Sequence, residues 1–140
     1  MNILIVQSLY HSAVSDVLAD TATAALQKGG AHFEIVAVPG ALEIPAAIRL
    51  AARTPAYDGF VALGSVVRDG GDYFDIIARE SASGLMHLSA EHGLCIGHGI
   101  ILADNEAGAL RQAEESDVGG DAARACLTLV TLKSRLGSRP

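Results

Sequence analysis

The sequence predicts an α/β domain built on a four-stranded parallel sheet. Four short apolar runs alternate along the chain with longer segments of helical periodicity, in the order βαβαβαβαα. Half of the residues are hydrophobic but only 4% are aromatic, so we expect a core of Ala, Val, Ile and Leu. With 140 residues, positions 1–140 fit one domain, because domains commonly span about 100–150 residues.

The first half of the chain supplies two strands and two helices. Residues 2–6 are a β-branched apolar run, and a polar turn separates them from a helical pattern over residues 12–28, which Gly29-Gly30 ends. Residues 32–38 are typical of a second strand, and a helix over residues 43–53 follows it.

The second half continues the alternation. Strands are predicted at 60–63 and 94–101, with a long helix at 74–92 between them and helices at 106–114 and 121–136 after them. All four apolar runs are nearly continuous, which is typical of strands buried on both faces. The alternation therefore indicates a parallel sheet with helices on both faces, joined by right-handed crossovers.

Ligands of such sheets bind outside the carboxyl ends of the strands. The loops at that edge are predicted at residues 7–11, 39–43, 64–73 and 102–106. Candidate site residues are therefore sought in these four segments.

Charge and hydropathy disfavour nucleic acid and a membrane as partners. Sixteen acidic against ten basic residues give a net charge of −6, which disfavours nucleic acid, because that affinity depends on basic side chains that neutralise phosphates. The apolar run 3–6 is too short for a signal peptide, and no run approaches the roughly 20 apolar residues that span a membrane. Cys95 and Cys126 lie in apolar surroundings without CxxC spacing, so we expect buried thiols and a reducing, cytoplasmic compartment.

The segment Pro39-Gly40-Ala41-Leu42-Glu43-Ile44-Pro45 follows the second strand and opens a helix. In a structural interpretation it is a plain strand-to-helix turn. In a functional interpretation its small residues expose backbone N–H groups to a polar ligand, and Glu43 accepts hydrogen bonds from hydroxyl or amino groups.

The loop from Gly64 to Phe74 leaves the third strand and enters the long helix. By position it could hold an anion, because glycine-rich loops before helices present N–H groups. However, Asp69, Asp72 and Asp75 fall within it or directly after it, and close carboxylates repel a phosphate. Asp72 or Asp75 is instead expected to cap the helix.

The five histidines form no metal-ligating pattern such as HExxH, so no metal site is expected. His98 stands out because it lies between Gly97 and Gly99 near the functional end of the fourth strand. A structural strand histidine and a catalytic one both remain open. Asp104-Asn105 is typical of a helix N-cap.

Several ordered motifs resemble the lumazine synthase family and together span nearly the whole chain. They are Pro39-Gly40-Ala41-Leu42-Glu43-Ile44-Pro45, Ala62-Leu63-Gly64-Ser65-Val66-Val67-Arg68, Phe74-Asp75, Asp104-Asn105 and Gly119-Gly120. The resemblance implies a flavodoxin-like three-layer αβα domain that assembles into pentamers, or multiples of them, with active sites between subunits.

The same resemblance implies a reaction and a set of contacts. The family condenses 5-amino-6-ribitylaminouracil with 3,4-dihydroxy-2-butanone 4-phosphate to give 6,7-dimethyl-8-ribityllumazine, the riboflavin precursor, without a cofactor. The implied contacts with the ribityl chain, the pyrimidine ring and the neighbouring loop are Gly40, Ala41, Leu42, Glu43, Val66, Val67, Arg68, Gly70 and Gly71.

The chain departs from the family at positions that carry chemistry. The family loop usually reads Arg-Gly-Glu-Thr-x-His-Phe, whereas here Gly71 occupies the phosphate-binding threonine position and Tyr73 the catalytic histidine position. A tyrosine, with an ordinary pKa of about 10, accepts protons poorly at neutral pH but can donate a hydrogen bond. The family's phosphate-binding arginine and lysine align with Gln112 and Val118, and Arg111 stands about 100° around the helix from Gln112.

The aromatic residue that the family stacks on the pyrimidine aligns with Leu9, next to Tyr10. Three interpretations stay open: a lumazine synthase with impaired activity, a relative acting on a substrate without phosphate, and a non-catalytic, flavin-binding scaffold oligomer. In all three the partners are a ribitylaminopyrimidine or flavin-like small molecule and further copies of the chain, not nucleic acid or a membrane.

Overall fold

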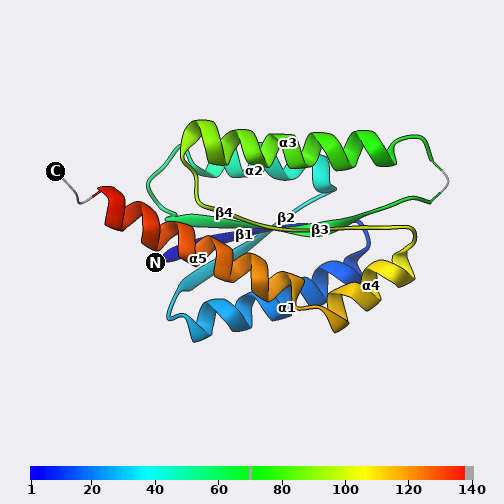
Figure 1. Cartoon of the computed structure of the whole chain (residues 1–140), viewed down its shortest axis with the longest axis horizontal. Helices are drawn as coiled ribbons and strands as arrows, with labels where there is room; N and C mark the ends of the chain where they lie inside the picture. The colour runs from blue at the N-terminus through cyan, green and yellow to red at the C-terminus, as the bar shows by residue number, and fades with distance from the viewer. Residues whose placement is uncertain (70, 138–140) are drawn as a thin grey trace.

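The computed structural model describes residues 1–69 and 71–137, and its chain forms three layers (Figure 1). The strands are β1 (Asn2–Ser8), β2 (His32–Val38), β3 (Gly59–Val67) and β4 (Ile96–Ala103). The helices are α1 (Ser12–Lys28), the 3₁₀ turn η1 (Ala41–Glu43), α2 (Ile44–Ala51), α3 (Phe74–His92), α4 (Glu106–Glu115) and α5 (Val118–Gly137). Among the described residues, no helix is long and apolar enough to cross a membrane.

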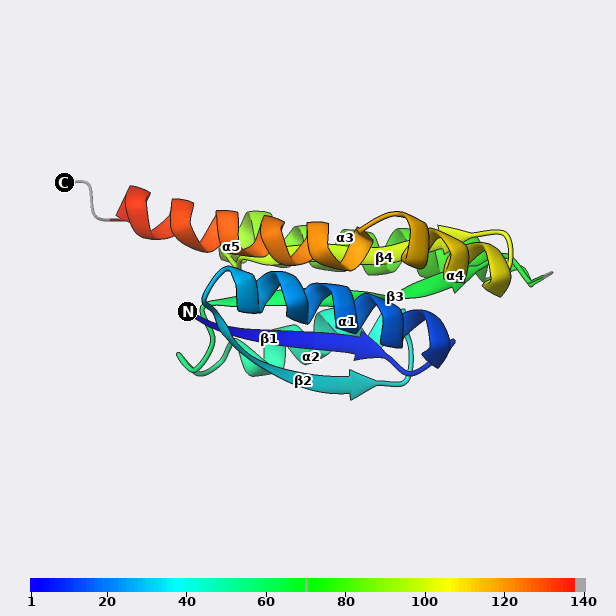
Figure 2. The same cartoon turned by 90° about the horizontal axis from the view of Figure 1, so that it is seen from below.

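The four strands are all parallel, in the order β2-β1-β3-β4. The predicted α/β fold with a four-stranded parallel sheet is therefore confirmed. Helices α1, α4 and α5 cover one face, and η1, α2 and α3 cover the other (Figures 1 and 2). The chain leaves β1 for β2 on one side and then returns past β1 to β3, so the topological switch point lies between β1 and β3.

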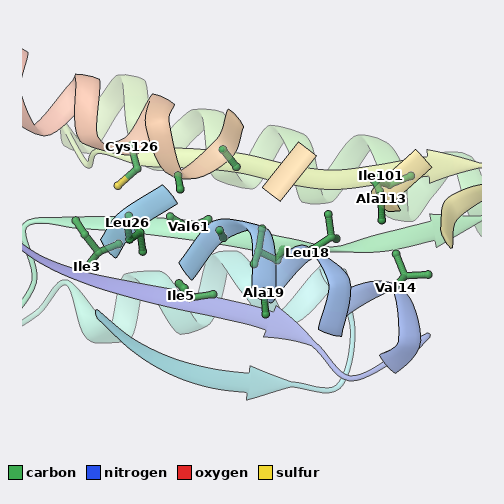
Figure 3. Close-up of a cluster of buried hydrophobic side chains, with 14 of the residues drawn as sticks. Ile3, Ile5, Val14, Leu18, Ala19, Leu26, Val61, Ile101, Ala113 and Cys126 are labelled. Atoms are coloured by element: carbon green, nitrogen blue, oxygen red, sulfur yellow. The ribbon is translucent and has the colours of Figure 1, made fainter. Parts of the chain in front are cut away.

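Alternation along the strands divides the core into two clusters. Ile3, Ile5, Val61 and Ile101 face α1 and α5, in the cluster drawn in Figure 3. The intervening residues of the same strands, with Ile44 of α2 and Leu85 of α3, form the second cluster on the opposite face. Two separate apolar layers hold the helices on both sides, as the sequence indicated.

One burial prediction is wrong. β1 and β3 are almost fully buried, but β2 is exposed or half-exposed along its whole length, and Ile35 and Val36 are 45% and 40% exposed. The reason is strand order: β2 is an edge strand, and Figure 2 shows it beyond the helix that covers β1. An apolar run does not reveal whether a strand is central or at the edge.

Three strands differ in their bounds from those predicted: β1 ends two residues later, at Ser8, and the bounds of β3 and β4 also change. Glycines in β3 and β4 permit close packing. β3 continues through Gly64 to Val67, since a Cβ at Gly64 would lie 2.9 Å from the Ser8 Cβ of the neighbouring strand. β4 begins and ends two residues later than predicted. A Cβ at Gly97 would collide with the backbone of Ala122, so this glycine lets α5 lie directly on the sheet.

Candidate functional site

A cavity of about 370 Å³ opens at the carboxyl ends of the strands, on the face covered by η1 and α3. The loops after β1, β2 and β3 all contribute to it, as expected at the switch point of a parallel sheet. Its lining residues are Tyr10, Pro39, Gly40, Ala41, Leu42, Glu43, Ser65, Val66, Val67, Asp69, Gly71, Tyr73, Phe74 and Ile77.

The turn after β2 forms one wall. Gly40 is extended, and the carbonyl of Gly40 accepts a hydrogen bond from the N–H of Glu43 at 3.2 Å, which closes η1. Ala41 is buried while Leu42 is 45% exposed. The Glu43 carboxylate lies over Gly40, since a Cβ at Gly40 would be 3.4 Å from the Glu43 Oε1. This wall thus presents an apolar side chain and one carboxylate.

The end of β3 forms the floor. Val66 is buried in the core cluster on the cavity side, and Val67 is buried in the cluster on the opposite side. Both residues line the cavity. The cavity thus has an apolar floor beside a wall that carries one carboxylate.

Arg68 does not line the cavity. Its guanidinium lies 4.2 Å from the centre of the Phe74 ring, and it pairs with Asp104 at 3.6 Å and with Asp75 at 3.9 Å. Its side chain is 55% exposed, so each ion pair is worth only about 0.2–1 kcal/mol. The arginine therefore fastens the loop to the N-terminal side of α3 and to the end of β4.

The loop after Arg68 brings an acid and a phenol to the cavity. Asp69, Gly71 and Tyr73 line it, and Tyr73 is 70% exposed; Gly70 lies outside the described residues. The predicted carboxylate cap of α3 is wrong: the N-cap is Tyr73, without a side-chain hydrogen bond, and Asp75 in the first turn pairs with Arg68.

The charged side chains that line the cavity, Glu43 and Asp69, are both acidic. No Lys or Arg belongs to the lining contributed by the described residues. The field inside the cavity of a single chain therefore opposes a phosphate dianion and favours a neutral or cationic ligand.

Comparison with known proteins places the chain in a family. The model of the 6,7-dimethyl-8-ribityllumazine synthase family matches residues 1–134. A 6,7-dimethyl-8-ribityllumazine synthase 1 from Mesorhizobium japonicum is 46% identical over 145 residues, which cover 99% of this chain and 88% of the relative. The chain belongs to the lumazine synthase family. The 6,7-dimethyl-8-ribityllumazine synthase from Zymomonas mobilis subsp. mobilis is also 46% identical, over 95% of this chain and 96% of the relative's own length.

The sequence offered two adjacent candidates for the aromatic position, Leu9 and Tyr10, and of these Tyr10 lines the cavity and Leu9 does not. The N–H of Leu9 donates to the Val38 carbonyl at 2.8 Å and that of Tyr10 to the Pro39 carbonyl at 3.1 Å. These bonds continue the pairing of β1 with β2 and hold the backbone of Tyr10 at the cavity.

The family positions on α4 and α5 fall outside the cavity of their own chain. Gln112 and Arg111 are exposed on α4, and Val118 begins α5 and packs partly against the core. The carboxamide oxygen of Asn105 accepts from the Gly108 N–H at 2.7 Å, which confirms the predicted cap. By the resemblance, the phosphate-binding positions are Gly71, Gln112 and Val118; of these, Gly71 lines the cavity and Gln112 and Val118 do not.

His98 is the third residue of β4 rather than a residue near its carboxyl end, because the strand starts later than predicted. It lies on the edge strand with much of its side chain exposed, and partial withdrawal of the ring from water by the surrounding atoms lowers the pKa of the imidazole below its ordinary value. An added Cβ at Gly97 or Gly99 would come too close to Ala122 of α5, so packing accounts for both neighbouring glycines. His98 does not line the cavity of its own chain.

The two thiols are buried and free. Burial raises the pKa of Cys126 to about 12, and its Sγ lies 3.6 Å from the Cys95 carbonyl. Within residues 1–69 and 71–137, no three His, Cys, Asp or Glu side chains are grouped to hold a metal ion.

Proposed function

We propose that this chain is a lumazine synthase of riboflavin biosynthesis, a transferase that condenses 5-amino-6-ribitylaminouracil with 3,4-dihydroxy-2-butanone 4-phosphate. The observation that carries the proposal is a single cavity formed by the Gly40–Glu43 turn and by Val66 and Val67, in a chain that matches the family along residues 1–134.

In this proposal the ribityl-pyrimidine occupies the cavity. Its ring lies over the end of β3 at Val66 with Tyr10 at its side, and Glu43 accepts hydrogen bonds from ribityl hydroxyls. Neutral hydroxyls that donate to a carboxylate form charge-assisted bonds, worth about 1.5–3 kcal/mol each. This half of the site is complete within one chain.

The part of the site that receives the butanone differs from the family pattern, because Tyr73 replaces the histidine. Tyr73 projects its hydroxyl at the loop end and donates a hydrogen bond to the carbonyl or the amine, while proton transfer falls to the substrate amine and solvent. Loss of a positioned acid–base group typically lowers the rate by about 10²–10⁴-fold. We therefore expect slow turnover rather than none.

A second candidate function is favoured by the charges. Glu43 and Asp69 line the cavity, and Arg68 is already paired with Asp75 and Asp104. A four-carbon carbonyl substrate without phosphate would avoid that repulsion. In this alternative the ring pocket is kept and the second substrate is different.

We further propose a homo-oligomer, most simply a pentamer or a multiple of it, with sites between subunits. His98 and Leu102 are exposed on the free edge of β4, on the same face as the cavity, and Ile35 and Val36 are exposed on β2 at the opposite edge. If His98 has a role at a site, it acts in the cavity of a neighbouring copy. Sedimentation of the purified protein as a monomer at all concentrations would refute this arrangement. A cytoplasmic location fits the two free, buried thiols.

The assay mixes purified protein with the ribitylaminouracil and either the butanone phosphate or the same butanone without phosphate, and follows lumazine formation by absorbance. Slow product from the phosphorylated compound supports lumazine synthase activity. Product from the unphosphorylated compound alone supports the second candidate. Ring binding without product from either compound supports the non-catalytic, flavin-binding scaffold, and the absence of both refutes the ring pocket.

A further inference from the structure

The loop between β1 and α1 holds a residue in an unusual backbone conformation. His11 has φ 57° and ψ 60°, and it is the one non-glycine residue with positive φ among the described residues. Left-handed backbone costs an ordinary side chain roughly 1–2 kcal/mol. Strain of this kind persists where the surrounding structure imposes it, and it often accompanies a functional site.

The surroundings of the His11 side chain impose this geometry. Its ring is only 12% exposed, and its Nδ1 lies 3.2 Å from the Glu106 Oε2 at the start of α4. The Nε2 is buried and has no hydrogen-bond partner among the described residues. The imidazole is thus held from one end, by a carboxylate at the start of α4.

The imidazole of His11 also contacts the ring of Tyr10. The two ring centres are 4.2 Å apart and the planes are inclined by 59°. Tyr10 is 58% exposed and lines the cavity. Its backbone N–H is fixed by Pro39 and by the Ser8 Oγ at 3.2 Å, and no hydrogen bond of its hydroxyl occurs among the described residues.

We propose that the Glu106–His11 pair positions Tyr10 as a wall of the ring pocket. Glu106 fixes the imidazole, and the imidazole fixes the tilt of the phenol against which a flat ligand stacks. The inference rests on the proposed function, because it needs a ring ligand in the cavity. It adds two positioning residues, one of them on α4, to a site otherwise formed by the loops after β1, β2 and β3.

The test uses riboflavin as a ring probe and follows the quenching of its fluorescence when it binds the full-length protein. Glu106→Ala releases the imidazole, and we expect riboflavin affinity to fall about 3- to 10-fold, the range of one aromatic contact. Glu106→Gln keeps an oxygen that accepts from Nδ1–H, so it should recover most of the affinity. Glu114→Ala removes an exposed carboxylate further along α4 and should bind like the unmodified protein.

Two further variants separate positioning from general destabilisation. His11→Asn keeps a residue that tolerates left-handed backbone but loses the ring, so affinity should fall while the melting temperature stays close to that of the unmodified protein. In a Tyr10→Leu background, Glu106→Ala should cause no additional loss, because the side chain it acts through is gone.

The outcomes distinguish this inference from the proposed function. If Tyr10→Leu weakens riboflavin binding but Glu106→Ala and His11→Asn do not, the ring pocket stands and the positioning role is refuted. Additive losses in the double variant also refute it. If the unmodified protein binds neither riboflavin nor the ribitylaminouracil, the proposed ring pocket fails, and this inference fails with it.

Discussion

Gly97→Ala tests whether the Gly97-His98-Gly99 motif serves packing rather than chemistry. An added Cβ would collide with the backbone of Ala122 and lie 3.2 Å from the Cβ of Cys126. A backbone carbonyl cannot rotate away as a side-chain end can, so α5 as a whole must move from the sheet. Overpacking of cores typically costs about 1–3 kcal/mol, and we expect a value of about 3 kcal/mol or more.

The corresponding change in melting temperature follows from chain length. An unfolding entropy of about 2.1 cal/mol/K per residue gives about 0.3 kcal/mol/K for 140 residues, so the melting temperature should fall by about 10 °C. Circular dichroism at one fixed protein concentration measures it, because assembly makes the value concentration-dependent. Gly137→Ala is the control, since no atom of the described residues lies within 4 Å of its added Cβ. A Gly97→Ala protein of unchanged stability with lost activity would contradict the packing explanation.

Three further predictions concern the cavity and the thiols. Asp69→Asn should lower the KM for the butanone phosphate about tenfold in steady-state kinetics. The reason is repulsion: a carboxylate roughly 8 Å from a dianion costs ~1.4 kcal/mol at an effective dielectric constant of about 60. Asp72 does not line the cavity, so Asp72→Asn should leave this KM unchanged. Tyr73→His should raise kcat by about 10²-fold. An unchanged kcat would exclude acid–base catalysis at this position. Because burial raises the pKa of Cys126 from 9.0 to about 12, the unfolded thiol ionises first as pH rises. Stability should therefore be full below pH 9 and decline by up to about 4 kcal/mol towards pH 12, and urea titrations of Cys126→Ala should lack that part of the decline.

Local signals were sufficient for much of the fold. The bounds of α1, β2 and α3 agree with those predicted, because Gly29-Gly30 ends α1 and the polar loop before Phe74 precedes α3. β3 was predicted too short, since Gly64-Ser65 is typical of a turn when seen alone. The close approach of β1 that requires this glycine is a tertiary feature, and no local pattern contains it.

The sequence did not reveal the order of the strands in the sheet or the direction in which individual side chains point. The apolar run of β2 resembles that of β1, yet only the sheet order reveals that β2 is at the edge and exposed. Leu9 and Tyr10 are adjacent, and the pairing that continues past β1 decides which of them reaches the cavity. The left-handed backbone at His11 was not predicted, because histidine is enriched in this conformation but most histidines do not adopt it.

The loop after β3 shows how position and chemistry separate in this chain. By position it is the expected anion site, at a strand end before a helix, and Arg68 is the expected cation. The structure directs that arginine away, over Phe74 and towards Asp104, while Asp69 lines the cavity. A phosphate would have to compete with existing ion pairs for Arg68 and approach a carboxylate as well. In the proposed oligomer, the cations for a phosphorylated substrate would come from a neighbouring copy, and the comparison of the butanone with and without phosphate measures whether assembly supplies them.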